Sequence, residues 1–485
     1  MFAGFRYTAA LVALATSAPS ALAGPVELII PSVEFALPVD PTPDLRGGLI
    51  AQDLDGDGRA DFVVTRPGTV VAVGSDGRVL WTRAVDVQVT ERAEENGLPG
   101  HHGPGVQAAD VTGDGHIEVL YLTRQGHLEI VAGKSGELIR TVRIASPPGT
   151  ERWEHLVVAD FRGEGDRDLL LQATNSEGYR MGSFLSAWAI PDLLDHDDAA
   201  PLWRRDDFIA AAHSGARVAD LDGDGRDEVV SGSVVGADGR KRLDLPVRGH
   251  IDAVQVADIL PGRRGFEVVA LEERGHRRLL PFDAAPARWL NQQVNRVWGA
   301  GNRVFVFGAD RLIWQEDYLR QEPQNAAAGR YLTGADELQI WCRSRYHVDQ
   351  KPFVFDARGR VIATYELSDV APADWTRSGV EVPAPIHWSG TGQQQLAVKA
   401  RHQDRSDVAV IDPLSGRFLV QARAEADRLY VADVTGDWRE ELVVLSGDRL
   451  RIYSNPDPNA DPDHPSLWTD RNYRRSRHTW NYYSP

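Results

Sequence analysis

The sequence predicts an all-β protein, an eight-bladed β-propeller with calcium-binding DxDxDGxxD loops. First, a phrase made of a short apolar strand, an Asp/Gly turn and a second short strand recurs along the chain. Second, further pairs of strands lie between its copies, and no convincing amphipathic helix follows the first 23 residues. Units of four strands at a recurring spacing are typical of propeller blades, in which radial closure protects the sheet edges.

The phrase has five clear copies and three degraded ones. The clear copies are GLIAQDLDGDGRADFVV (48–64), GVQAADVTGDGHIEVLYL (105–122), HLVVADFRGEGDRDLLL (155–171), GARVADLDGDGRDEVVSG (215–232) and RLYVADVTGDWREELVVL (428–445). The degraded copies are at 253–271, 325–341 and 384–400. Eight copies predict eight blades, or seven if one degraded copy is only a loop.

The remaining strands of each blade come from segments such as TVVAVGSDGRVLWTR (69–83) and HLEIVAGKSGELIRTV (127–142). We expect one propeller domain over residues 24–485. The ring would be closed by VELII (26–30), or by the C-terminal segment 455–485 acting as an extra strand or a cap on the last blade.

The first 23 residues combine an early Arg6, an apolar stretch and an A-L-A end, which is typical of a secretory signal peptide cleaved after Ala23. No later run approaches the roughly 20 apolar residues of a membrane span. The only cysteine is Cys342, so export would occur without disulfides. We expect a secreted or periplasmic monomer. A net charge of −17 without a basic stripe argues against nucleic-acid binding.

The Asp/Gly turns have the spacing of calcium loops. In 53–61, carboxylates occupy loop positions 1, 3, 5 and 9, and hard cations prefer several oxygen ligands arranged in this way. The predicted ligands in four loops are Asp53, Asp55, Asp57 and Asp61; Asp110, Thr112, Asp114 and Glu118; Asp220, Asp222, Asp224 and Glu228; and Asp433, Thr435, Asp437 and Glu441. We expect several Ca²⁺ ions with a mainly structural role. In 160–168 an arginine, Arg162, stands at position 3 and is expected to replace the ion.

Histidines gather at the other end of the same strands. The strand before each metal loop would line the channel, so the residues that precede it would lie at the opposite rim, where binding funnels form. These positions hold His101, His102, His155, His213 and His250, together with Asn325, His387 and Arg428. We interpret the histidines as a functional cluster. A zinc site is the rival interpretation, but no H-x-x-x-H pattern or cysteine partner supports it.

The segment HSGARVADLDGDGRDEVVSGSVVGADGR, followed by GHIDAVQVADILPGRRGFEVVALEE, resembles the propeller of the family 11 rhamnogalacturonan lyases. The calcium loops also resemble the integrin-like FG-GAP repeats. The lyase resemblance implies an eight-bladed, calcium-bearing propeller that cleaves an acidic polysaccharide. It places the family's two histidines at His213 and His250 and its aspartate at Asp252. The chain departs from the family in having no room for the family's additional N-terminal β-domain.

Cleavage of a uronate polymer by β-elimination needs a group that neutralises the carboxylate, a base for the C5 proton and an acid for the leaving oxygen. Histidine suits the last two roles because its ordinary pKa is near 6.5. We expect His102 or His213 to act as base or acid, with His101, His155 and His250 completing the cluster. The expected carboxylate clamp is Arg343, Arg345 and Lys351, with Arg428 as a second candidate. The alternative is a non-catalytic propeller that binds glycan or protein.

Overall fold

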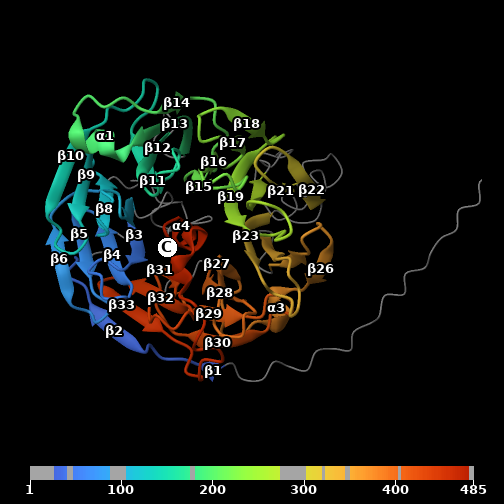
Figure 1. Cartoon of the computed structure of the whole chain (residues 1–485). Coiled ribbons are helices and arrows are strands. Elements are labelled where there is room, and N and C mark those ends of the chain that lie inside the picture. Colours follow the sequence, from blue (N-terminus) through green and yellow to red (C-terminus); the bar gives the residue numbers. More distant parts are fainter. Residues whose placement is uncertain are drawn as a thin grey trace, which may run out of the picture.

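The computed structural model describes residues 27–40, 47–87, 105–174, 181–212, 214–273, 302–318, 323–344, 350–401 and 406–479. Their strands form eight sheets arranged as a ring, so the eight-bladed propeller is confirmed (Figure 1). In each blade, consecutive strands pair antiparallel. The first strands of neighbouring blades contact one another around the channel.

Blades 1 to 4 each consist of four strands consecutive in sequence. They are β3 (Gly48–Gln52), β4 (Asp61–Arg66), β5 (Thr69–Val73) and β6 (Val79–Arg83); β7 (Val106–Ala109), β8 (Glu118–Leu122), β9 (His127–Ala132) and β10 (Leu138–Arg143); β11 (Trp153–Ala159), β12 (Asp168–Thr174), β13 (Met181–Ala189) and β14 (Trp203–Arg205); and β15 (Arg217–Ala219), β16 (Glu228–Val230), β17 (Ser233–Val235) and β18 (Lys241–Asp244).

Blades 5 to 8 use the later strands, and two of them take in the start of the chain. They contain β19 (His250–Ala257), β20 (Glu267–Glu273), β21 (Asn302–Phe307) and β22 (Leu312–Tyr318); β23 (Pro323–Gly329), β24 (Gln339–Ser344), β25 (Phe353–Phe355) and β26 (Val361–Thr364); β27 (Val380–Ile386), β28 (Gln395–Ala400), β29 (Val408–Ile411) and β30 (Phe418–Ala422); and β31 (Arg428–Ala432), β32 (Glu441–Ser446) and β33 (Arg449–Tyr453).

The N-terminal strands close the ring. Strand β2 (Val33–Ala36) pairs antiparallel with β33 and supplies the fourth strand of blade 8. Strand β1 (Glu27–Leu28) lies within the segment expected to close the ring, but it adds to blade 7 instead, parallel to β30. The closing strand therefore follows the expected segment by a few residues, because the chain passes the outer edge of blade 7 before it reaches blade 8.

Short helices are present where the sequence predicted none. They are α1 (Ile190–Asp195), α3 (Leu367–Val370), α4 (Arg471–Arg477) and the 3₁₀ turn η1 (Leu467–Thr469). Each has at most seven residues, which is too short for an amphipathic period to be recognised in the sequence. None of the described helices is long and apolar enough to cross a membrane.

The hydrophobic core is divided into eight clusters among the described residues, one between each pair of neighbouring blades. The inner and second strands are buried on both faces, so they consist of nearly continuous runs of Val, Leu, Ile and Ala. Ring closure requires all eight interfaces, and the cluster between blades 8 and 1 contains Leu37 and Val39 from the N-terminal segment.

An aromatic residue on an outer strand of one blade packs on a turn glycine of the next. The Trp81 ring lies so close to Gly136 that an added Cβ would come within 2.7 Å of it, and the Trp81 indole N–H donates to the Gly133 carbonyl at 2.6 Å. The same pairing joins Trp203 to Gly239 and Trp314 to Gly359. These turn glycines also have positive φ, so no other residue fits without strain.

Candidate active site

The two ends of the channel differ. Each inner strand begins at one face, here called the rim, and ends in the Asp/Gly loop at the opposite face. Helix α4 lies inside the ring (Figure 1), and its arginines form ion pairs with loop residues. Arg475 Nη2 lies 2.8 Å from both Asp166 and Asp227, and Arg477 Nη1 lies 3.6 Å from Glu440. Helix α4 therefore docks inside the channel through ion pairs, and Trp468 and Tyr473 of the same segment also form hydrogen bonds with the backbone of Asp433 in the last blade.

At the rim of blade 5, three titratable side chains come together. His250 Nε2 lies 2.9 Å from Asp252 Oδ1 and 3.7 Å from Glu273 Oε2. Asp252 and Glu273 are buried, whereas about a quarter of the His250 side chain is exposed (27%). The ligand atoms of the three lie within 4.8 Å of one another, so the group could also hold a cation. Both carboxylates lie beside the same imidazole nitrogen, so they fix the orientation of the ring.

The irregular backbone at the rim helps to explain why His250, Asp252 and Glu273 come together. Strand β19 has a register shift between Ile251 and Ala253, so Asp252 is the extra residue of a β-bulge. Comparable shifts occur at the rim ends of β11, β23 and β27. Bulges change the direction in which side chains point and are frequent beside active sites.

Blades 6 and 7 add buried charged and polar groups at the same end of the ring. Asn325 of β23 and Arg343 of β24 are cross-strand partners, and the Arg343 guanidinium donates to the Val380 carbonyl at 2.9 Å. On blade 7, Lys399 Nζ lies 3.0 Å from Glu381 Oε1, and both side chains are almost fully buried. No role was predicted from the sequence for Glu273, Glu381 or Lys399. One feature of the sequence could have singled out Lys399 as a candidate site residue, because the chain contains few lysines.

His155 is placed next to the neighbouring blade rather than in open solvent. It is 2% exposed, and its Nε2 lies 2.8 Å from the Ala216 carbonyl. Gly215 packs directly on the imidazole ring, where a Cβ would clash at 2.1 Å. Ala212 N donates to the Ile251 carbonyl at 2.7 Å. Residues of the segment before β15 therefore contact blade 3 on one side and blade 5 on the other.

Other predicted residues lie apart from this group. Arg428 is buried and donates to the Gly47 carbonyl, which joins blade 8 to blade 1. Lys351 is partly exposed and lies 2.5 Å from Glu366. His387 follows the end of β27, so it lies at the loop face and not at the rim as expected. His101, His102, His213 and Arg345 fall outside the described residues.

The Asp/Gly loops bring carboxylates together at the loop face. Asp53, Asp55 and Asp57 form one group whose ligand atoms lie within 4.8 Å, and Asp220, Asp222 and Glu228 form another. Burial, together with the charge of Asp222, raises the pKa of Glu228 to about 7. In the first loop, burial raises the pKa of Asp61 to about 6. Such crowding of buried carboxylates is compatible with a hard cation, which would neutralise them.

The loop at 160–168 is held in another way. Arg162 Nε lies 2.7 Å from Asp168 Oδ1, and its Nη1 lies 2.8 Å from Glu164 Oε2. The guanidinium thus fills the loop between positions 5 and 9, as the sequence suggested. In loop 433–441, Asp433 is buried, and burial raises the pKa of Glu441 to about 8. In the same loop, Arg439 forms an ion pair with Asp437 at 2.7 Å.

Comparison with known proteins agrees with this architecture. Residues 158–294 match the family model of the C-terminal domain of rhamnogalacturonan lyase family 11, and residues 53–121 and 110–171 match the FG-GAP-like repeat. The chain is 26% identical over 472 residues to the rhamnogalacturonan exolyase YesX of Bacillus subtilis, covering 83% of the chain and 70% of that protein. It is 24% identical to the rhamnogalacturonan endolyase YesW of the same organism, covering 73% of the chain and 54% of that protein.

Solved structures show the same fold. The crystal structure of the exotype rhamnogalacturonan lyase YesX superposes with a TM-score of 0.64 at 19% identity, covering 94% of the chain and 81% of that structure. A Bacillus licheniformis rhamnogalacturonan lyase gives a TM-score of 0.60 at 19% identity, covering 90% and 76%. The resemblance to the family 11 rhamnogalacturonan lyases is therefore confirmed, and these relatives agree with the prediction of a polysaccharide lyase.

Proposed function

We propose that the chain is an exported polysaccharide lyase that cleaves an acidic, uronate-containing, rhamnogalacturonan-like polysaccharide by β-elimination at the rim of its propeller. The observation that carries this proposal is His250, held between Asp252 and Glu273 at a partly exposed position. The matched relatives act on rhamnogalacturonan, and the family model overlaps blade 5, where this group lies.

His250 is the group best suited to move a proton. About a quarter of its side chain is exposed, and the two carboxylates beside Nε2 would stabilise the charge that the imidazole gains when it takes the C5 proton of the uronate. Positive charge at the rim of blade 6, from Arg343, would favour a bound uronate carboxylate. His101, His102, His213 and Arg345 remain candidates for the second proton transfer and for the carboxylate clamp.

The calcium loops have a different role in this proposal. The four loops beginning at Asp53, Asp110, Asp220 and Asp433 would hold Ca²⁺ through their carboxylate and Thr oxygens. The ions would neutralise buried charge and fix the turns between the first two strands of four blades. The rim group belongs to blade 5, which carries none of these four loops, so structural ions and rim chemistry are separable by mutation.

The test is incubation of the purified chain, with Ca²⁺ present, with rhamnogalacturonan I, a glucuronan, an ulvan and a neutral glucan as control. Lyase action creates an unsaturated uronate, which is detected by its ultraviolet absorbance. The proposal expects absorbance to rise with rhamnogalacturonan I. If no acidic polymer gives a rise but one of them binds in a pull-down, the chain is a non-catalytic glycan-binding propeller and the proposal fails.

A further inference from the structure

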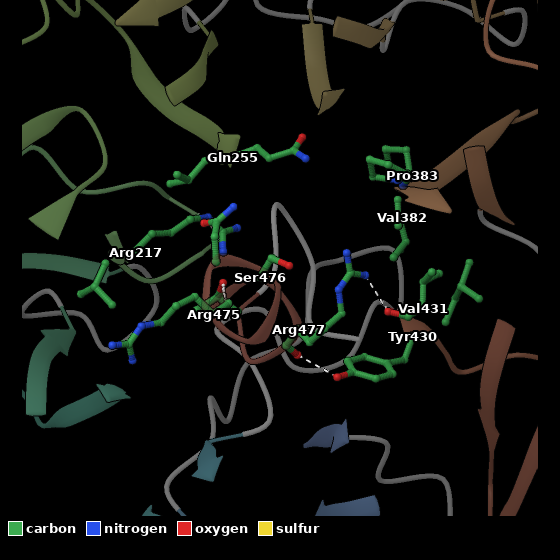
Figure 2. A pocket seen from close by; sticks show the side chains of 16 residues that line it. Arg217, Gln255, Val382, Pro383, Tyr430, Val431, Arg475, Ser476 and Arg477 are labelled. Carbon is green, nitrogen blue, oxygen red and sulfur yellow. Dashed lines mark hydrogen bonds between the residues drawn. The ribbon is translucent and has the colours of Figure 1, made fainter. Parts of the chain in front are cut away.

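One cavity in the channel is separate from the rim group, since neither His250, Asp252 nor Glu273 lines it. It has a volume of about 120 Å³ and is enclosed by the inner strands β15, β19, β27 and β31 and by helix α4. Figure 2 shows Arg217 and Gln255 on one side and Val382, Pro383 and Val431 on the other. None of the 16 residues that line it carries a carboxylate.

Arg217 is the charged group at this cavity that has no counter-ion among the described residues. Its side chain is 6% exposed, and its Nε donates to the Val254 carbonyl at 2.6 Å. The two other arginines that line the cavity are paired, Arg475 with Asp227 and Arg477 with Glu440. Arginine keeps its charge even when buried, so Arg217 carries a positive charge that no described carboxylate balances.

The pKa values show the same contrast. Burial alone lowers the pKa of Arg217 to about 9. Burial also acts to lower the pKa of Arg477, but Glu440 and Tyr473 outweigh burial and the pKa is raised. An unbalanced buried charge is strongly unfavourable unless it is paired. An anion in the cavity would supply the missing partner.

The opposite wall is apolar and is held in a strained shape. Val382 has a φ of 51°, in the left-handed region that β-branched residues rarely adopt. It lies in the irregular stretch of β27 between Glu381 and Ala384. Pro383 follows it along the cavity wall. Strain of this kind persists where the surrounding structure enforces it, and it is frequent at binding sites.

We propose that this cavity binds one small organic carboxylate, with the carboxylate on the Arg217 guanidinium and the carbon skeleton against Val382, Pro383 and Val431. A guanidinium fork matches the two oxygens of a carboxylate, and the Nε–Val254 contact fixes its orientation. The ligand is either a free short-chain acid or the uronic acid end of a sugar. The site is independent of the proposed lyase chemistry, because none of its lining residues belongs to the rim group.

Isothermal titration calorimetry on the full chain tests the site with propionate and D-galacturonate, and with 1-propanol and D-galactose as neutral counterparts. One carboxylate should bind per chain, and the neutral compounds should not. Binding of propionate identifies a free short-chain acid as sufficient, whereas binding of galacturonate alone identifies the sugar acid. Absence of binding by both acids, or equal binding of a neutral counterpart, overturns the proposal.

Variants locate the site. Arg217→Gln should weaken carboxylate binding at least about tenfold, because one charge-assisted pair is removed. Arg240→Gln, at an exposed turn of blade 4, removes the same charge and should leave binding unchanged. If Arg217→Gln does not fold, Ala384→Leu fills the cavity from β27 without touching Arg217 and should abolish binding. Unchanged binding in either cavity variant contradicts the site.

The polymer assay is run on the same samples. Ala384→Leu should keep lyase activity, since the rim group is unaltered. Loss of carboxylate binding with lyase activity retained supports two separate sites. Absence of lyase activity in a wild-type protein that binds the carboxylate would refute the proposed function while leaving the cavity site standing.

Discussion

Arg475 of helix α4 lies 2.8 Å from Asp227 of blade 4, so residues far apart in sequence form an ion pair inside the channel. Asp227 is 2% exposed and Arg475 is 10% exposed. Arg471 reaches the same carboxylate at 3.2 Å. These ion pairs hold the C-terminal segment at the loop face of the ring.

Asp227→Asn should destabilise the protein by about 3–5 kcal/mol, because removal of one partner leaves the other charges of a buried group uncompensated. Differential scanning calorimetry measures the loss. Asp238→Asn is the matched control, since Asp238 lies on an exposed turn of the same blade and should change stability by less than about 0.5 kcal/mol. Equal stability of the two variants would show that α4 docking contributes little.

His250→Gln should lower the lyase turnover number by about 10²–10⁴-fold, the usual contribution of general acid–base catalysis. The melting temperature should change little, because the imidazole is partly exposed. His196→Gln, at the exposed end of α1, should retain full activity. Wild-type turnover in His250→Gln would exclude this residue as the proton carrier.

The calcium proposal predicts different metal contents when the same loop position is altered in two different loops. Asp114→Asn and Glu164→Gln each alter position 5, but only the loop at 110–118 lacks an arginine in its interior. Metal analysis after equilibrium dialysis should show about one fewer Ca²⁺ per chain in Asp114→Asn. The stoichiometry of Glu164→Gln should match the wild type. The opposite pattern would mean that Arg162 does not replace an ion.

His478 predicts a pH dependence of stability. Burial lowers its pKa from 6.5 to about 4, although its contact with the Ala51 carbonyl opposes this. Because the folded pKa is depressed, the unfolded chain binds the proton first as the pH falls. The contribution of His478 to the free energy of unfolding is fully present above about pH 6.5. Between about pH 6.5 and about pH 4, the free energy of unfolding falls by about 1.4 kcal/mol per pH unit.

Chemical denaturation of the wild type and of His478→Asn across this range measures the effect. The variant lacks the titrating group, so its free energy of unfolding should fall less steeply than that of the wild type. His464→Asn, which alters a partly stacked, exposed histidine near the same end of the chain, should follow the wild-type slope. Parallel curves for wild type and His478→Asn would contradict the assignment.

Much of the architecture could be predicted because its signals are local. The loop at 53–61 contains its own carboxylates and glycines, so spacing alone indicates a cation loop. The strand runs around it have continuous apolar centres, such as FVV in DFVVTR, and predict buried strands. Repetition of this phrase predicted the number of blades and the resemblance to the lyase family.

The candidate site was predictable only in part. His250 and Asp252 are two residues apart on one strand, so the sequence could pair them. Glu273 joins them only because β20 folds back beside β19 in a defined register. Glu381 and Lys399 are likewise cross-strand partners on blade 7. Nothing in their local sequence distinguishes them from surface charges, and the pairing depends on sheet register.

By itself, the sequence determined the repeat, the blade count, the Asp/Gly loops and the family resemblance, since each is encoded within a short stretch of chain. Only the tertiary structure decided that β2 completes blade 8, that α4 lies in the channel and that Arg217 faces a cavity without a carboxylate. The physical reason is that these features arise from contacts between distant segments. Closure of the ring brings those segments together, and no local period or spacing records it.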